Sequence, residues 1–160
     1  MSRSIRWLVA IATGVTAQRV CDAQELPPLQ GEVRGDVFVA RGVTVHAGAG
    51  VSVRAGQNVR ISIVAGAGRA FEDAESQFSA RVEVTGRFLM DPAFSAKWGV
   101  YAGGGVGLRK ERSDSFLGVL ILVLGAEGQR CGAFVPFVET GYGGGLRLSA
   151  GLRQGLMGRR

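Results

Sequence analysis

Apolar and polar residues alternate along most of this chain, and this alternation constrains the fold more than any other feature. In the segment 41–55, valine and alanine occupy the odd positions from Val43 to Val53, whereas Thr44 and His46 lie at even positions. A period of two residues is that of a β-strand with one apolar and one polar face. The sequence therefore predicts an all-β protein.

The alternation predicts eight strands, separated by glycines, by Asp91–Pro92 and by charged segments. Their predicted ranges are 33–40, 42–54, 58–68, 77–90, 97–109, 116–124, 133–142 and 146–154. Charged segments at 71–76 and 110–114 are expected to form loops, and Glu127–Arg130 a turn. Strands joined in this order favour an antiparallel up-and-down barrel, with a strand count between six and eight.

Residues 1–23 are typical of a secretory signal peptide. Arg3 and Arg6 precede the apolar run 7–12, and Ala17 and Ala23 offer two cleavage sites, of which we favour the second. Its removal takes away three arginines and one aspartate, so the net charge falls from +6 to +4. The mature chain is predicted to be exported and basic.

The mature chain divides into three parts. Residues 24–31 are expected to form an extended lead-in, 32–156 the barrel domain and 157–160 a basic tail. Cleavage after Ala23 also removes Cys21 and leaves Cys131 as the remaining cysteine, so we expect no intramolecular disulfide.

The same alternation fits a soluble barrel with an apolar interior and a membrane barrel with an apolar exterior. The signal peptide, the small residues on the polar parity and the 26 glycines favour the membrane barrel, because an eight-stranded interior is narrow. The longest apolar run, 116–124, is too short for a spanning helix, which needs about 20 residues. Residues expected to face lipid are Val43, Val45, Val51, Ile61, Ile63, Val82, Val84, Val100 and Val106.

Aromatic residues fall near the predicted strand ends, as in membrane barrels that carry aromatic girdles at both interfaces. The charged loops are taken to lie outside the membrane and the short turns in the periplasm. The aromatic residues near the periplasmic ends are Phe88, Trp98, Phe134 and Phe137, and those near the external ends are Phe78, Phe116 and Tyr142.

The polar parity is expected to line the interior, where charges must be paired because little water reaches them. Tyr101 is predicted to point inward with Gly103, Gly105 and Gly107, which leave room for bulky neighbours in the range 117–123. No cofactor is expected, and we expect the carboxylates of Glu72, Asp73 and Glu75 to be solvated and not to bind a metal. The predicted interior network consists of His46, Arg60, Arg81, Glu83, Arg87, Glu139 and Arg147.

The stretches 98–107 and 137–145 are rich in glycine and aromatic residues. In them, and in its pattern over residues 33–156, the chain resembles the small outer-membrane barrels typified by the transmembrane domain of outer membrane protein A. The resemblance implies a transmembrane β-barrel of about eight strands in the outer membrane, with lipid, lipopolysaccharide and the barrel assembly machinery as partners. The chain departs from the family where Gly158–Arg159–Arg160 replaces a terminal aromatic residue that the insertion machinery reads.

A non-enzymatic structural, surface or envelope-integrity role is the function that this reading favours. One alternative is a soluble periplasmic barrel that binds a small apolar ligand. Another is a lipid A-modifying enzyme that uses the single histidine, His46, with a serine and a carboxylate. A nucleic-acid partner is not expected, because the sequence has no basic helix, zinc motif or aromatic–basic strand. A protein partner stays unknown.

Overall fold

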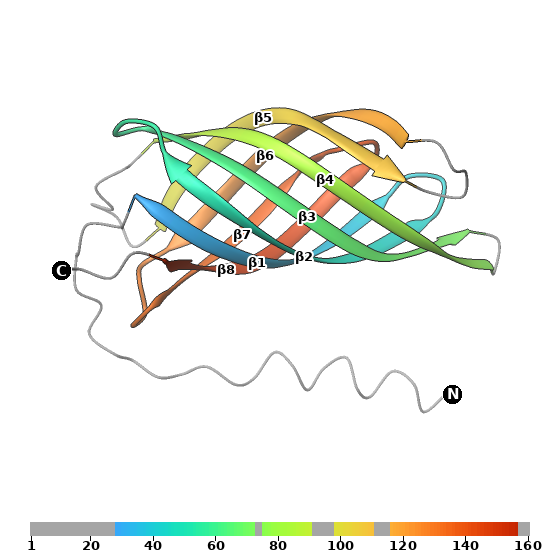
Figure 1. Cartoon of the computed structure of the whole chain (residues 1–160), viewed down its shortest axis with the longest axis horizontal. Coiled ribbons are helices and arrows are strands. Elements are labelled where there is room, and N and C mark those ends of the chain that lie inside the picture. The colour runs from blue at the N-terminus through green and yellow to red at the C-terminus, as the bar shows by residue number, and fades with distance from the viewer. Residues whose placement is uncertain (1–27, 73–74, 91–97, 111–115, 157–160) are drawn as a thin grey trace.

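The computed structural model describes residues 28–72, 75–90, 98–110 and 116–156. Each strand is antiparallel to the next, and the last pairs with the first, so the sheet closes into a barrel (Figure 1). The prediction of an all-β, antiparallel barrel of eight strands is confirmed. The strands are β1 (Leu29–Val39), β2 (Val43–Arg54), β3 (Val59–Glu72), β4 (Glu75–Leu89), β5 (Trp98–Lys110), β6 (Phe116–Gly128), β7 (Phe134–Tyr142) and β8 (Leu146–Gly155).

The two ends of the barrel are distinguished by the positions of the strand termini and the hairpins. We call the end at which β1 begins and β8 ends the terminal end, and the opposite end, on the right in Figure 1, the distal end. The hairpins β1–β2, β3–β4, β5–β6 and β7–β8 are connected at the distal end. Within the described part of the chain, we find no helix that is both long and apolar enough to cross a membrane.

The strand register fixes the width of the barrel. Paired residues followed once around the barrel lead from Leu89 through Tyr101 and Asp36 to Ser79, ten residues away on the same strand. At ordinary strand spacing, this displacement corresponds to a strand tilt of about 40° and a backbone radius of about 8 Å. Side chains fill an interior of this size.

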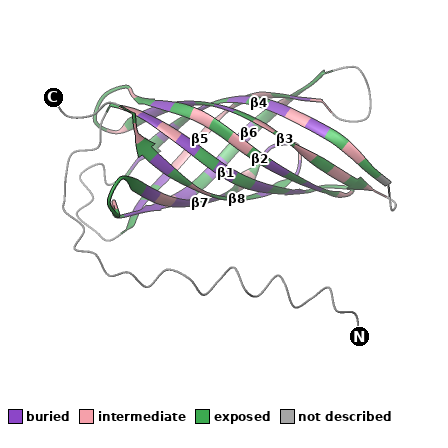
Figure 2. Ribbon diagram, turned by 60° about the horizontal axis from the view of Figure 1, so that its bottom comes forward, coloured by how far each residue is buried: buried purple, intermediate pink, exposed green. Residues whose placement is uncertain are grey.

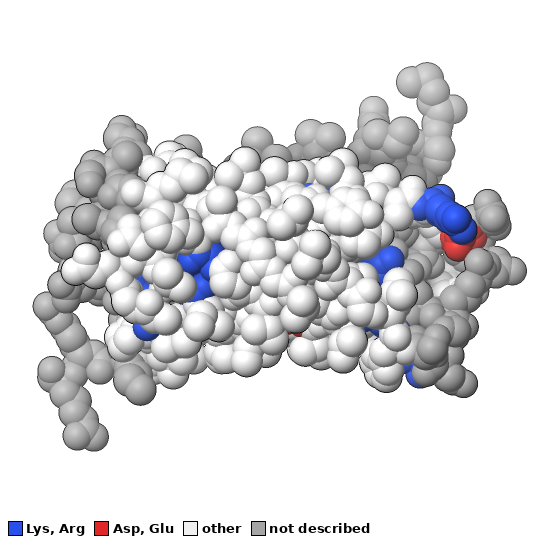
Figure 3. Space-filling model, turned by 90° about the horizontal axis from the view of Figure 1, so that it is seen from above, with Lys and Arg blue, Asp and Glu red and all other residues white. Residues whose placement is uncertain are grey.

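Buried and exposed residues alternate along each strand (Figure 2), and the apolar parity lies on the outside. All nine residues predicted to face lipid point outward, with exposed fractions from 41% for Ile61 to 62% for Val106. In the space-filling view the outer wall is mostly uncharged, and the largest charged group on this face lies at the distal end (Figure 3). The barrel thus has an apolar exterior and a polar interior, the reverse of the arrangement in a soluble barrel.

Exposed aromatic side chains occur near both ends of the outer wall. Phe88, Trp98 and Phe134 lie at the terminal end, as predicted. The exposed aromatic residues near the distal end are Phe71, Phe78, Phe116 and Tyr142. The prediction was wrong for Phe137, which points inward and is buried, because it shares the parity of Glu139.

Several strands are longer than predicted. β1 begins at Leu29, inside the predicted lead-in, because Gln30 already pairs with both neighbouring strands. The predicted loop at 71–76 is shorter, since Glu72 and Glu75 are still paired across the hairpin. Residues 1–27, 73–74, 91–97, 111–115 and 157–160 lie outside the described residues, and with them the predicted signal peptide, the Asp91–Pro92 break, most of the 110–114 loop and the basic tail.

Inward glycines allow neighbouring strands to approach closely. A Cβ atom at Gly105 would lie 2.0 Å from the carbonyl oxygen of Val84 on the adjacent strand, and no larger residue fits there. As predicted, bulky side chains fill the space beside these glycines, and buried Ile121 is the clearest case. Leu117 differs from that prediction, because it lies near the distal rim and is largely exposed. Glycines of this kind let a sheet bend into a narrow barrel.

Candidate functional site

The first strand supplies three consecutive inward charges. Glu32, Arg34 and Asp36 alternate with outward Val33 and Gly35, and all three charged residues are buried. The rest of the interior charge comes mainly from β4 and β7, whose side chains reach those of β1 across the narrow lumen, and from β8, which is paired with β1. A group of ion pairs therefore occupies the place of an apolar core.

One cluster lies toward the distal end. Arg147 binds Glu83 in a bidentate manner, with nitrogen–oxygen distances of 2.8 and 3.0 Å, and Arg81 reaches the same carboxylate at 2.8 Å. Both arginines also contact Asp36, which accepts a further hydrogen bond from Ser149. Two carboxylates thus hold two arginines in fixed positions, since planar guanidinium groups match carboxylates in geometry.

Arg34 links this cluster to the rest of the interior. Its guanidinium group lies 3.1 Å from Asp36 and 3.2 Å from Glu32, which are two residues away on either side along β1. It also reaches across the lumen to Glu139, at 2.5 Å. The network is therefore continuous along the barrel axis.

Glu139 is the central acceptor of the network. Besides Arg34, it contacts Arg87 at 2.9 Å and Arg153 at 3.3 Å. The hydroxyl group of Tyr101 donates a hydrogen bond to it at 2.9 Å. These cationic and hydroxyl donors compensate the free-energy cost of removing the Glu139 carboxylate from water.

A second cluster lies toward the terminal end. Arg60 binds Glu127 at 2.5 and 3.0 Å, and Arg153 binds the same carboxylate at 2.6 Å. Arg153 also contacts Glu32 at 3.0 Å, and Arg87 lies 3.7 Å from that residue. Glu127 was predicted to lie in a turn, and this was wrong, because β6 continues to Gly128 and points Glu127 inward.

Aromatic rings complete the packing around the arginines. The guanidinium carbon of Arg153 lies 3.9 Å from the centroid of Phe137, and Arg34 faces the same ring at 5.5 Å. Near the distal end, Phe38 is surrounded in the same way by Arg81 and Arg147. Such contacts stabilise a cation in a space that excludes water.

All seven residues of the predicted interior network are buried inside the barrel, and six of them take part in ion pairs. The exception is His46, which packs its ring edge against Phe38 with centroids 5.6 Å apart. Within the described part of the chain, neither ring nitrogen of His46 has a hydrogen-bond partner, so no described serine is hydrogen-bonded to it as a nucleophile.

Sequence reasoning missed half of the network. The residues that were missed all lie at inward-facing positions of their strands. The alternation of charged residues with valine and glycine was visible in β1 and β8, whereas the pairing partners depend on the closed register. The missed charged residues are Glu32, Arg34, Asp36, Arg109, Glu127 and Arg153.

Only part of the predicted acidic loop lies within the described residues. Glu72 and Glu75 are paired at the end of the β3–β4 hairpin, and Asp73 lies outside the described residues. Among the residues that the structure describes, no three His, Cys, Asp or Glu side chains are grouped in a way that could hold a metal ion.

Comparison with known proteins finds similarity among solved structures. No protein-family model and no curated protein sequence matches the chain. Among solved structures, the chain is similar to the solution NMR structure of the de novo designed transmembrane β-barrel TMB2.3, with a TM-score of 0.55. The match covers 84% of this chain and 98% of the design at 14% sequence identity, so it supports the barrel fold alone.

Proposed function

We propose that the protein is a small outer-membrane β-barrel with a non-enzymatic structural, surface or envelope-integrity role. The observation that carries this proposal is the polarity of the barrel, with Val106 and its outward neighbours exposed and Arg147 and Arg153 buried inside. In water such a wall would leave a large apolar area exposed, which soluble monomers avoid. In a bilayer the same wall is solvated by lipid.

The dimensions of the strands agree with this placement. Membrane-crossing strands need about 9–11 residues when tilted, and the strands of this barrel range from nine residues in β7 to 15 in β4. Exposed aromatic side chains near both ends, such as Trp98 and Phe116, suit the two interfaces. A spanning orientation therefore satisfies length, polarity and end composition together.

We place the distal end outside the cell and the terminal end in the periplasm. Arg69 and Lys110 lie on distal hairpins, where anionic lipopolysaccharide forms the outer leaflet. Lipid, lipopolysaccharide and the barrel assembly machinery are the partners that this placement implies. Export by the signal peptide at 1–23 is part of the proposal.

The charged interior also bears on the two alternative functions. A barrel that binds a small apolar ligand needs an apolar lumen, whereas Glu83, Glu139 and their arginine partners occupy this one. A lipid A-modifying enzyme needs an activated nucleophile, and among the described residues none is hydrogen-bonded to His46. These observations favour the structural role.

Fractionation of cells that express the full chain tests the location. We expect the mature protein in the outer-membrane fraction, beginning after Ala23 on N-terminal sequencing, and running faster on a gel when it is not heated. Recovery from the soluble periplasm without detergent would favour the ligand-binding barrel, and an intact Met1 on exported protein would refute the signal peptide.

Two assays test the role. A strain that lacks the protein should become more sensitive to detergents and bile salts, and complementation by the intact chain should restore resistance. A change in lipid A mass upon expression, abolished by His46→Ala, would instead indicate the enzyme. An unchanged lipid A together with restored resistance is the expected result.

A further inference from the structure

The strand β6 is paired along its full length on one side only. All 13 of its residues pair with β5, whereas only residues 122–127 pair with β7. The other seams of the barrel contain nine to 14 residue pairs, so this seam is the shortest among the described strands. β7 ends at Tyr142, and among the described residues no strand continues beside residues 116–121 of β6. The distal part of β6 therefore forms a free edge in the wall.

The backbone groups of this edge can be assigned to one side or the other. The carbonyl oxygen of Leu122 lies against β7. Because successive residues of a strand direct their N–H and C=O groups to opposite sides, Phe116, Gly118 and Leu120 direct theirs away from β5, to the unpaired side. No backbone hydrogen bond reaches these groups from the described turn at 143–145. An unpaired edge of this kind is a template for another strand.

The outer face of the edge is apolar. Phe116 and Leu120 point outward with exposed fractions of 65% and 66%. Gly118 lies between them and leaves its outer face open, because nothing lies within 4 Å of a Cβ atom placed there. In the proposed orientation the edge lies between the apolar wall and the distal aromatic residues, where water offsets an unpaired backbone group poorly. A strand with apolar outward residues would continue the wall.

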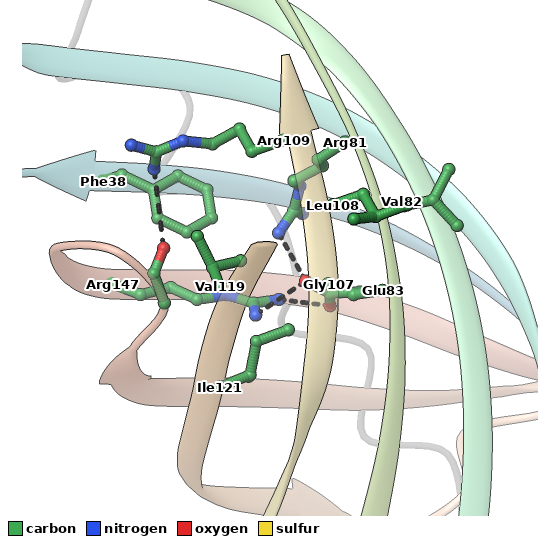
Figure 4. A pocket seen from close by; sticks show the side chains of 11 residues that line it. Phe38, Arg81, Val82, Glu83, Gly107, Leu108, Arg109, Val119, Ile121 and Arg147 are labelled. Atoms are coloured by element: carbon green, nitrogen blue, oxygen red, sulfur yellow. Dashed lines mark hydrogen bonds and ion pairs between the residues drawn. The ribbon is translucent and has the colours of Figure 1, made fainter. Parts of the chain in front are cut away.

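The inner side of the edge is close to a cation. Val119 points to the lumen and lines a small recess that Arg109 also lines (Figure 4). The β7–β8 turn contacts both, since a Cβ atom at Gly144 would lie 3.2 Å from Val119 and 3.4 Å from a guanidinium nitrogen of Arg109. Buried arginines also outnumber buried carboxylates in the described interior. An inward acidic side chain on a docked strand is therefore complementary in charge.

We propose that the free edge of β6 binds an extended peptide segment of another protein, in which apolar residues alternate with acidic ones. The segment runs antiparallel to β6, as β7 does, and its backbone pairs with Phe116, Gly118 and Leu120. Its apolar residues face outward, and its acidic residues face Arg109. This pairing depends on the strand register and not on the proposed membrane location.

Other occupants fit the edge less well. A second copy of this chain would bring its own Arg109 and Lys110 close to those of the first, and Lys110 already lies 6.0 Å from the ring of Phe116. The segments of this chain that continue from β1 and β8 leave the barrel at the terminal end, away from this edge. Charge and position thus favour an acidic segment from a different protein.

Two variants at one position test the pairing. The N–H group of Gly118 points to the free side, so Gly118→Pro removes a donor from the edge and leaves the β5–β6 ladder intact. Gly118→Ala keeps the donor and adds its Cβ atom in open space. The probe is a fluorescent peptide of about nine residues in which valine and glutamate alternate, titrated with the full-length protein in neutral detergent. Gly118→Pro should weaken binding at least about tenfold, and Gly118→Ala less than about twofold.

Peptide variants test the chemistry of the partner. N-methylation of the valine amides should abolish binding, because these N–H groups face β6 in antiparallel pairing, whereas N-methylation of the glutamate amides should have a much smaller effect. Lysine in place of glutamate should weaken binding at least about tenfold, since it faces Arg109. The amide hydrogen of Gly118 should exchange fast in the free protein and slowly with the peptide bound, whereas that of Val119, which is directed to β5, should exchange slowly in both.

Other results would overturn the proposal. These are no binding of the valine–glutamate peptide by the unaltered protein, equal affinity for Gly118→Pro and Gly118→Ala, or equal binding of the glutamate and lysine peptides. A dimer of the unaltered protein that Gly118→Pro converts to a monomer would assign the edge to a second copy instead. Gel mobility before and after heating shows whether each variant is folded, and if Gly118→Pro does not fold, the methylated peptides decide. Fractionation tests the proposed location separately, so the two proposals fail independently.

Discussion

Carboxylates are the scarcer partner inside the barrel, and each one serves several arginines. Asp36 and Glu83 share Arg81 and Arg147, and Glu139 contacts three arginines. The described interior contains five buried carboxylates and seven buried arginines. Removal of one carboxylate therefore leaves more than one cation without compensation.

The Glu83–Arg147 pair allows the dependence of the arginines on their shared carboxylates to be measured. We expect Glu83→Gln and Arg147→Gln to show a coupling of roughly 1–3 kcal/mol in a double-mutant cycle, because their side chains form a bidentate contact. The free energy of unfolding in phosphatidylcholine vesicles is the quantity to measure. Glu83→Gln combined with Arg60→Gln is the control, and those two effects should add within about 0.5 kcal/mol.

A second prediction at the residue scale concerns charged substitutions on the outer wall. Val84 and Met90 both point outward from the same chain segment, but Val84 lies near the middle of β4 and Met90 just beyond its terminal end. Arginine at the midplane of a lipid-facing wall costs roughly 2–4 kcal/mol, and near the interface about 0–1 kcal/mol. Val84→Arg should therefore impair refolding into vesicles far more than Met90→Arg, and equal effects would contradict a spanning orientation.

At the scale of the strand, inward glycines set how closely neighbours approach. Gly105→Ala would place a Cβ atom against the Val84 carbonyl oxygen, so we expect a loss of roughly 1–3 kcal/mol in unfolding free energy. Gly35→Ala adds its Cβ to the outer wall, where nothing lies within 4 Å, and should be neutral or slightly stabilising. Equal losses in denaturant titrations of the two variants would mean that close strand approach is not what requires glycine.

The strands were predictable from sequence to the extent that alternation was uninterrupted. β2 and β4 carried a clear period of two, and their core positions were assigned to the correct faces. Glu72 and Glu127 were assigned to a loop and a turn because of their charge, so the strands there were predicted too short. Glu127 has inward partners on β3 and β8, and that pairing exists only once the sheet has closed.

The interior network was predictable only in part for the same reason. Parity alone assigned residues such as Arg87 and Glu139 to the lumen. The choice of partners depends on the register and on the displacement of ten residues around the barrel. Neither can be deduced from the sequence of a single strand. Phe137 was misplaced because an aromatic residue near a strand end suits an interface as well as a cation inside.

For the molecule as a whole, the filled lumen predicts the absence of a large pore. Arg34, Tyr101 and Glu139 meet across the axis, so purified protein in planar bilayers should show no stable porin-sized current steps. Glu139→Ala is an informative variant, because it removes the central acceptor and should raise brief, small current events if the network seals the lumen. Large stable steps from the unaltered protein would show that the interior is open.

The contacts between β1 and β8 also bear on the order of events during folding. Glu32 receives Arg153, and Asp36 receives Arg147, across sequence separations of 121 and 111 residues. Until the final strand docks, these carboxylates lack their partners on β8 and have only those on β1 and β4, such as Arg34 and Arg81, so a partly assembled sheet has less tendency to insert. Contacts of such long range form late. Closure of the barrel and neutralisation of its interior would then be a single late step, and a chain that stalls before β8 would be left outside the bilayer, accessible to proteases and chaperones.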